Sequence, residues 1–197
     1  MLHDIAKKYG YGKIKKYIDV YSDIFDSLQK KQITILELGV YDGGSLKMWH
    51  DYFINAKIIG LDWDKRENII DLEDRVQMYY GDQSDLSLLQ KIVNDYKSFD
   101  IIIDDAAHTA NKARASYDFL FSHLNSGGYY VIEDWGTGYW GSWEDGKNFE
   151  NKHYAGMVGL IKDLVDESGL DDIGKKDKTS PFEYLRISHG QAIIKKK

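Results

Sequence analysis

Residues 33–45 read ITILELGVYDGGS, and this stretch decides the predicted fold. Its first half is a short apolar run rich in β-branched residues, which is typical of a strand buried on both faces. Its second half contains Gly39 and Gly43-Gly44, which suit a turn where a ligand approaches the backbone closely. The apolar residues that follow recur at helical spacing: Leu46, Trp49 and Phe53. The stretch therefore predicts a buried strand, a glycine-containing turn and a helix.

The same alternation continues along the chain. Further apolar strands are expected at 57–62, 75–80, 99–104 and 129–132, with a closing antiparallel pair at 182–188 and 191–196. Helical patterns follow the first, third and fourth strands, and a leading helix is expected over 14–28. Strands that are apolar throughout and alternate with helices indicate a parallel sheet covered on both faces. We predict an α/β, Rossmann-like fold: a mostly parallel seven-stranded sheet with a C-terminal antiparallel pair.

The composition suits a globular protein, with 43% hydrophobic and 29% charged residues. A chain of 197 residues fits one domain, which we divide into an N-terminal helical segment packed on the core (1–30) and the main domain (31–197). The net charge of −6 disfavours a nucleic-acid partner, and the absence of cysteine excludes thiolate metal sites. No membrane span or signal peptide is visible, so we expect a cytoplasmic protein without a membrane partner.

Lysines gather near the N-terminus, Lys13 among them, and again at 195–197. We expect both groups to be solvated.

Acidic residues follow the predicted strands where each strand ends. They are Glu37, Asp62, Asp82, Asp104, Asp105, Glu133 and Asp134. Any one of them could simply cap a helix. In parallel sheets, however, ligands bind beyond the carboxyl ends of the strands. An ordered series of acids along that edge therefore predicts a binding pocket.

The turn after the first strand narrows the choice of ligand. A dinucleotide site would need G-x-G-x-x-G, but Tyr41 takes the place of the middle glycine, and no P-loop lysine follows. S-adenosylmethionine (SAM) carries no phosphate. It needs an apolar slot for adenine, an acid for the ribose and carboxylates that tolerate its cationic groups. Asp62 suits the ribose, Glu37 lies near the methionine end, and Asp82 with Gln83 lies near adenine.

Five segments in this order resemble the class I SAM-dependent methyltransferases: residues 33–49, 58–64, 81–85, 99–108 and 127–135. Within that class the chain is similar to the metal-dependent sugar O-methyltransferases of macrolide and aminocoumarin biosynthesis, often labelled cephalosporin-hydroxylase-like. The likeness covers about residues 10–140 and resumes weakly in the last strand pair. It implies a magnesium-dependent O-methyltransferase that acts on a hydroxyl of a small molecule such as a sugar. Relatives also suggest a homo-oligomer.

The resemblance also implies roles for individual residues. SAM would contact Glu37, Gly39, Tyr41, Ser45, Asp62 and Asp82. The magnesium ligands would be Asp105, Glu133 and Asp134, and the general base would be His108. The chain departs from many members at Ala106-Ala107, where they have Gly-Ser, and it is shorter than they are. These departures bear on the acceptor more than on the chemistry.

The chemistry accounts for these residue types. A sugar hydroxyl is a poor nucleophile at neutral pH, and a bound cation can orient it and lower its pKa. Magnesium prefers oxygen ligands in octahedral geometry, and three carboxylates at neighbouring strand ends meet that need; they suit Mn²⁺ equally well. His108 follows Asp105 by three residues and is placed to accept the hydroxyl proton. A surface histidine is the alternative.

Residues 135–153 lack periodicity and contain several large aromatic side chains. Tyr139 and Trp140 are candidate acceptor-binding residues in a mobile lid, although they could instead plug the end of the sheet as core. Two other functions stay open. One is a metal-independent methyltransferase in which the acids are scaffold, and the other is a non-catalytic SAM- or nucleotide-binding module. A nicotinamide-dependent oxidoreductase is disfavoured, and no facial triad for hydroxylation is visible.

Overall fold

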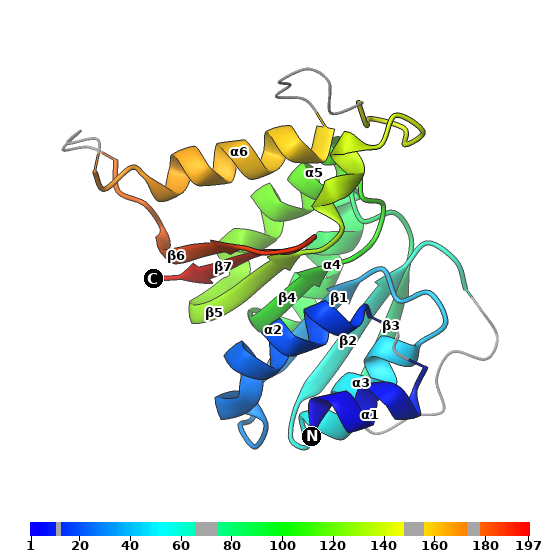
Figure 1. Cartoon of the computed structure of the whole chain (residues 1–197). Coiled ribbons are helices and arrows are strands. Elements are labelled where there is room, and N and C mark those ends of the chain that lie inside the picture. The colour runs from blue at the N-terminus through cyan, green and yellow to red at the C-terminus, as the bar shows by residue number, and fades with distance from the viewer. Residues whose placement is uncertain (11–12, 66–74, 148–155, 173–177) are drawn as a thin grey trace.

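A computed structural model describes residues 1–10, 13–65, 75–147, 156–172 and 178–197. Its centre is a seven-stranded sheet in the order β3-β2-β1-β4-β5-β7-β6 (Figure 1). The strands are β1 (Thr34–Leu38), β2 (Lys57–Asp62), β3 (Val76–Tyr80), β4 (Phe99–Asp104), β5 (Leu124–Ile132), β6 (Phe182–Ile187) and β7 (Ala192–Lys196). The first five strands are parallel, whereas β7 runs antiparallel to both β5 and β6. The predicted fold class is confirmed.

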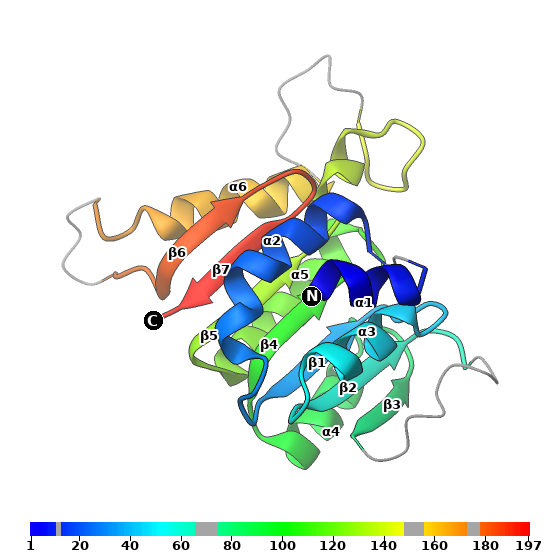
Figure 2. The ribbon, with the colours of Figure 1, turned by 60° about the horizontal axis from the view of Figure 1, so that its bottom comes forward.

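Helices cover both faces of the sheet, as Figures 1 and 2 show from two sides. One face carries α1 (Leu2–Lys8), α2 (Lys15–Phe25) and α3 (Gly44–Tyr52). The other carries α4 (Leu86–Tyr96), α5 (Ala110–Leu120) and α6 (Gly156–Ser168). Short 3-10 turns follow α2, α5 and β5: η1 (Asp26–Leu28), η2 (Phe121–His123) and η3 (Trp135–Tyr139). Within the described ranges, no helix combines the length and apolar character needed to cross a membrane.

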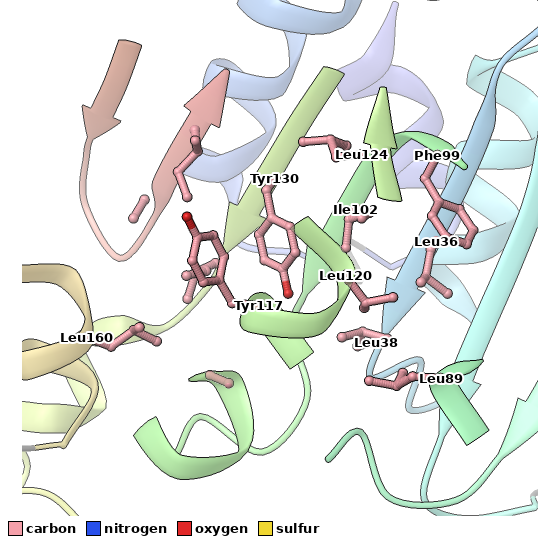
Figure 3. Close-up of a cluster of buried hydrophobic side chains, with 14 of the residues drawn as sticks. Leu36, Leu38, Leu89, Phe99, Ile102, Tyr117, Leu120, Leu124, Tyr130 and Leu160 are labelled. Atoms are coloured by element: carbon pink, nitrogen blue, oxygen red, sulfur yellow. The ribbon is translucent and has the colours of Figure 1, made fainter. Parts of the chain in front are cut away.

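The two faces of the sheet are packed into separate buried clusters. In β1, Ile35 joins the cluster that contains α2 and α3 residues, whereas Leu36 joins the cluster beneath α4, α5 and α6. Figure 3 shows the second cluster, where the rings of Tyr117 and Tyr130 meet edge to face with centroids 5.2 Å apart. Successive side chains of a strand point to opposite faces. A strand covered on both sides is therefore apolar throughout, which explains the continuous runs in the sequence.

Two elements differ from the sequence expectation. The leading helix predicted over 14–28 is divided into α2 and η1, and it is preceded by α1, which was not predicted. β5 begins at Leu124 rather than at 129, because Leu124 already pairs with Phe99 of β4 before a register shift brings Tyr129 opposite Ile101. Gly127 and Gly128 lie inside this strand, ahead of its predicted start.

The sheet register brings the acidic strand ends together. Leu38, at the end of β1, pairs with Leu61 of β2 on one side and with Asp104 of β4 on the other. Asp104 in turn pairs with Ile132 at the end of β5. The residues directly after these strands therefore share one edge of the sheet, and the strand order reverses direction between β1 and β4. Such a switch point is where ligands bind in open α/β sheets.

Candidate functional site

A cavity of about 540 Å³ lies at this edge. Five of the predicted cofactor residues line it, together with one predicted metal ligand and the predicted base: Gly39, Tyr41, Asp62, Asp82, Gln83, Asp105 and His108. Glu37 and Ser45 do not line it but lie buried, where the Ser45 hydroxyl donates a hydrogen bond of 2.9 Å to Glu37 Oε2. A pocket at the predicted place thus contains most of the predicted residues.

The turn after β1 forms one wall of the cavity and is held by Asp62. Asp62 Oδ2 accepts hydrogen bonds of 2.8 Å from the backbone N–H groups of Val40 and Tyr41. Gly39 has a φ of 84°, and a Cβ added there would overlap the carbonyl oxygen of Asp105. The turn after β1 and the loop after β4 therefore pack backbone to backbone, and only glycine allows this contact.

Lys112 of α5 brings a positive charge to the cavity that the sequence analysis did not identify. Its Nζ lies 2.7 Å from Asp82 Oδ2 and 5.2 Å from the ring centroid of the exposed Trp63. Burial opposes ionisation of Asp82, but the hydrogen bonds from Lys112 and Ser84 together outweigh burial and lower the pKa of that carboxyl. The end of the cavity predicted for adenine therefore holds an ion pair beside an aromatic ring.

A buried network fixes the loop that carries Asp105 and His108. Gln83 Nε2 donates to both oxygens of Asp104, at 2.9 and 3.0 Å, and Gln83 Oε1 accepts from the backbone N–H of Ala107 at 2.8 Å. Ser116 also donates to Asp104, and burial raises the pKa of that carboxyl. Asp104, whose role the sequence left open, thus anchors the loop of residues 105–108.

Asp105, His108 and Asp134 each bring one potential ligand atom to within 4.8 Å of the others. His108 Nε2 lies 3.7 Å from Asp105 Oδ1 and 3.8 Å from Asp134 Oδ2. His108 and Asp134 both have left-handed backbones, with φ of 50° and 53°. Such conformations are uncommon outside glycine and gather at functional sites. Two carboxylates and an imidazole in this arrangement can hold a divalent cation.

Lys13 is buried, contrary to the expectation that it is solvated. Its Nζ lies 2.8 Å from Glu37 Oε1, 2.8 Å from Asp105 Oδ2 and 3.0 Å from Glu133 Oε1. Burial alone would lower the pKa of Lys13, but the charges of Asp105, Glu133 and Glu37 raise it well above its usual value. The ammonium is therefore a fixed positive charge among three acids.

Glu133, a predicted metal ligand, contacts groups of the protein instead. Its Oε1 accepts a hydrogen bond from the Tyr21 hydroxyl and pairs with Lys13. Burial, followed by the charge of Asp105, raises the pKa of Glu133 well above its usual value. Glu133 does not belong to the group formed by Asp105, His108 and Asp134. Its role as a ligand stays a prediction.

The aromatic segment after β5 contacts the backbone of His108. Trp143 Nε1 and Thr137 Oγ1 donate to the His108 carbonyl oxygen at 2.9 and 3.1 Å. Trp140 is 54% exposed, and neither it nor Tyr139 lines the cavity. Their role in acceptor binding stays a prediction. Residues 148–153 of the predicted lid lie outside the described residues.

Sequence reasoning missed Lys13, Tyr17 and Tyr21 as part of the site. Tyr17 and Tyr21 lie in the predicted leading helix, where their ring spacing indicates only an apolar face, yet their hydroxyls donate to Asp134 and Glu133. The available signal was the spacing: positions 13, 17 and 21 recur every four residues and each carries a hydrogen-bond donor.

Comparison with known proteins gives the same architecture. The chain is 31% identical to mycinamicin VI 2''-O-methyltransferase of Micromonospora griseorubida and 30% identical to demethylmacrocin O-methyltransferase of Streptomyces fradiae, over 99% of its length in both cases. It covers 52% and 53% of these proteins, so it spans about half the length of the curated relatives that it matches. No family model matches the chain.

The chain is also similar to a solved structure, the MycE methyltransferase from the mycinamycin biosynthetic pathway in complex with Mg, SAH and mycinamycin VI. The match covers 99% of this chain and 53% of the MycE chain, with a TM-score of 0.88 and 30% sequence identity. The chain has the class I methyltransferase fold. The resemblance that five sequence segments indicated is confirmed.

In this methyltransferase fold, two groups of residues share one cavity. Asp62, Asp82 and Gln83 face the space predicted for the methyl donor. Asp105 and His108 line the same cavity and also belong to the candidate cation group. The arrangement can therefore place a cation and a proton acceptor beside a bound cofactor.

Proposed function

We propose that the protein is a SAM-dependent O-methyltransferase that requires Mg²⁺ and acts on a hydroxyl of a small molecule such as a sugar. The observation that carries this proposal is the gathering of Asp105, His108 and Asp134 beside the cavity lined by Asp62 and Asp82. A small-molecule acceptor is inferred from the relatives, whose names describe O-methyltransferases of mycinamicin and demethylmacrocin, and a sugar hydroxyl from the resemblance to sugar O-methyltransferases.

The residues of the cavity suit SAM. Leu61, Ala106 and Ala107 provide apolar lining, and Asp62 can accept hydrogen bonds from ribose hydroxyls in addition to those it receives from the backbone. Glu37, the carboxylate predicted for the methionine end, does not line the cavity and lies buried against Lys13 and Ser45. No lysine or backbone loop of the P-loop type is needed, because the cofactor carries no phosphate.

The cation would be held by Asp105 and Asp134, with Glu133 as the third ligand if its carboxylate is released by Lys13. A bound Mg²⁺ supplies a positive charge that orients the acceptor oxygen and lowers the pKa of its hydroxyl. His108 Nε2 then accepts the hydroxyl proton, and the oxygen forms its bond to the methyl carbon as the carbon–sulfur bond breaks. Trp143 and Thr137 keep the His108 backbone in place through its carbonyl.

The first test measures methyl transfer from labelled SAM to a panel of glycosides, with and without Mg²⁺. We expect turnover to disappear with excess chelator and to return when Mg²⁺ is added back. Asp105→Ala should abolish turnover and leave the affinity for SAM nearly intact, since Asp105 acts on the cation. Turnover that persists in excess chelator would contradict the metal requirement, and a melting temperature that SAM does not raise would contradict cofactor binding.

One observation favours a second candidate, a metal-independent methyltransferase. Lys13 already balances part of the charge of Glu37, Asp105 and Glu133, so these acids could be a permanent scaffold. The chelator experiment separates the two functions. His108→Ala refines the first: loss of turnover with retained metal affinity marks a base, whereas loss of both marks a ligand.

A further inference from the structure

Three buried donors lie along α2 and the residues just before it, on the side that faces the candidate site. Tyr17 and Tyr21 are four residues apart in the helix, the spacing that places side chains above one another, and Lys13 lies four residues before Tyr17, just ahead of the N-cap residue Ile14. Each donor reaches a carboxylate that follows a strand: Lys13 reaches Asp105, Tyr17 reaches Asp134, and Tyr21 reaches Glu133.

Two of these carboxylates bind a donor through one oxygen, and the other oxygen of each faces His108. The Tyr17 hydroxyl donates to Asp134 Oδ1 at 2.5 Å, while Asp134 Oδ2 lies 3.8 Å from His108 Nε2. In the same way, Lys13 contacts Asp105 Oδ2, while Oδ1 lies 3.7 Å from His108 Nε2. A carboxylate that is held at one oxygen cannot rotate freely, so the position of its second oxygen is fixed.

The Tyr17 hydroxyl lies close to a turn near the far end of the chain. A Cβ added at Gly190, in the turn between β6 and β7, would overlap this hydroxyl. Gly190 therefore leaves the space that the phenol needs to reach Asp134. Tyr17 is 2% exposed and does not line the cavity, so it acts on a ligand only through Asp134.

The charges around the site favour a bound cation. Three carboxylates, those of Glu37, Asp105 and Glu133, surround the ammonium of Lys13, and a fourth, that of Asp134, lies near His108 and has no ammonium partner among the described residues. The neutral hydroxyl of Tyr17 orients Asp134 without offsetting its charge. A divalent cation at the free oxygens would therefore meet a negative cluster whose geometry is already set.

We propose that Tyr17 is a positioning residue of the cation site: it fixes one oxygen of Asp134 so that the other faces the ion beside His108. This inference rests on the proposed function, because it requires a divalent cation at that place. Removing a side chain that orients a metal ligand in this way commonly weakens metal binding by about 10- to 100-fold.

The experiment compares Tyr17→Phe with the wild-type chain and with the matched variant Tyr79→Phe. Both substitutions remove a phenol hydroxyl that donates to a carboxylate, at 2.5 Å to Asp134 and at 2.6 Å to Asp95. Binding of Mn²⁺ is measured by electron paramagnetic resonance with S-adenosylhomocysteine present, and binding of S-adenosylhomocysteine is measured separately by calorimetry. We expect Tyr17→Phe to weaken Mn²⁺ binding about tenfold. Tyr79→Phe should leave it unchanged.

Two further readouts separate positioning from a general structural role. Tyr17→Phe should leave the melting temperature and the Kd of S-adenosylhomocysteine close to the wild-type values, and excess Mg²⁺ should restore turnover. A Mn²⁺ Kd within twofold of wild type would overturn the inference while leaving the proposed function intact. Parallel losses of Mn²⁺ binding, S-adenosylhomocysteine binding and melting temperature would also overturn it. A wild-type chain that binds S-adenosylhomocysteine but no Mn²⁺ would remove the metal requirement and this inference together.

Discussion

Lys13 is the residue on which the stability of the acidic cluster depends most directly. Its side chain has no exposed surface and lies within 3.0 Å of oxygens of Glu37, Asp105 and Glu133. Removal of one partner from a buried ionic group leaves charges without compensation, which typically costs 3–5 kcal/mol, that is about half the stability of a marginal domain. The effect arises from one side chain and is therefore tested at one position.

Lys13→Met is expected to lower the free energy of unfolding by about 3–5 kcal/mol. Urea denaturation followed by circular dichroism measures this change. The matched control is Lys16→Met, because Lys16 is exposed, and its effect should stay within about 0.5 kcal/mol. Equal effects of the two variants would show that the charge of Lys13 does not stabilise the cluster.

The sequence identified the site residues that follow strands and missed those that reach the site from elsewhere. Asp62, Asp105 and His108 were predictable because a strand end fixes where the next side chain lies. Lys13 was not, since its contact with Asp105 joins positions 92 residues apart and depends on how α2 packs against the sheet. Lysine near a chain end is ordinarily solvated, so composition gave the wrong expectation.

The turn between β1 and α3 shows how one element can set the shape of the cavity. Gly39 has a left-handed backbone and touches the loop after β4. We expect Gly39→Ala to push that loop away and to abolish binding of S-adenosylhomocysteine, with a clear drop in melting temperature. Calorimetry and a thermal scan measure the two effects.

Gly127→Ala is the control for backbone strain. Gly127 also has a positive φ, of 75°, but a Cβ there would meet nothing within 4 Å. This variant should cost only the left-handed strain, about 1–2 kcal/mol, and should bind S-adenosylhomocysteine normally. If both alanine variants bind alike, contact between the turn and the loop is not what shapes the cavity.

Periodicity predicted most elements of the sheet because both of its faces are buried. The runs at 57–62 and 99–104 coincide with β2 and β4. Local signals failed where tertiary pairing decided the structure: β5 extends through Gly127 and Gly128 because β4 pairs with its earlier residues. α1 contributes only Leu2 and Ala6 to the buried residues, which is too little to establish a helical period.

At the scale of the whole molecule, buried phenols should limit stability in alkali. Burial raises the pKa of Tyr17, Tyr21 and Tyr130 above the ordinary value of 10.0. Above that pH the unfolded chain releases protons that the folded chain retains. The unfolded state then binds fewer protons, so the free energy of unfolding falls as pH rises.

We therefore expect the melting temperature to fall steadily above pH 10 and these phenols to ionise only as the protein unfolds. Ultraviolet absorbance of tyrosinate, recorded during alkaline titration with and without denaturant, measures both. The denatured chain should ionise all 15 tyrosines near the ordinary pKa. A native titration curve that overlays the denatured one would contradict the prediction.

Three of the four non-glycine residues with a left-handed backbone in the described part of the chain, Tyr41, His108 and Asp134, lie at the candidate site. Each such conformation costs roughly 1–2 kcal/mol and is relieved by glycine. Laboratory evolution for heat resistance alone would thus favour glycine at these three positions. The most heat-resistant descendants would then have lost the groups that perform the chemistry, so selection for robustness has to be coupled to selection for turnover.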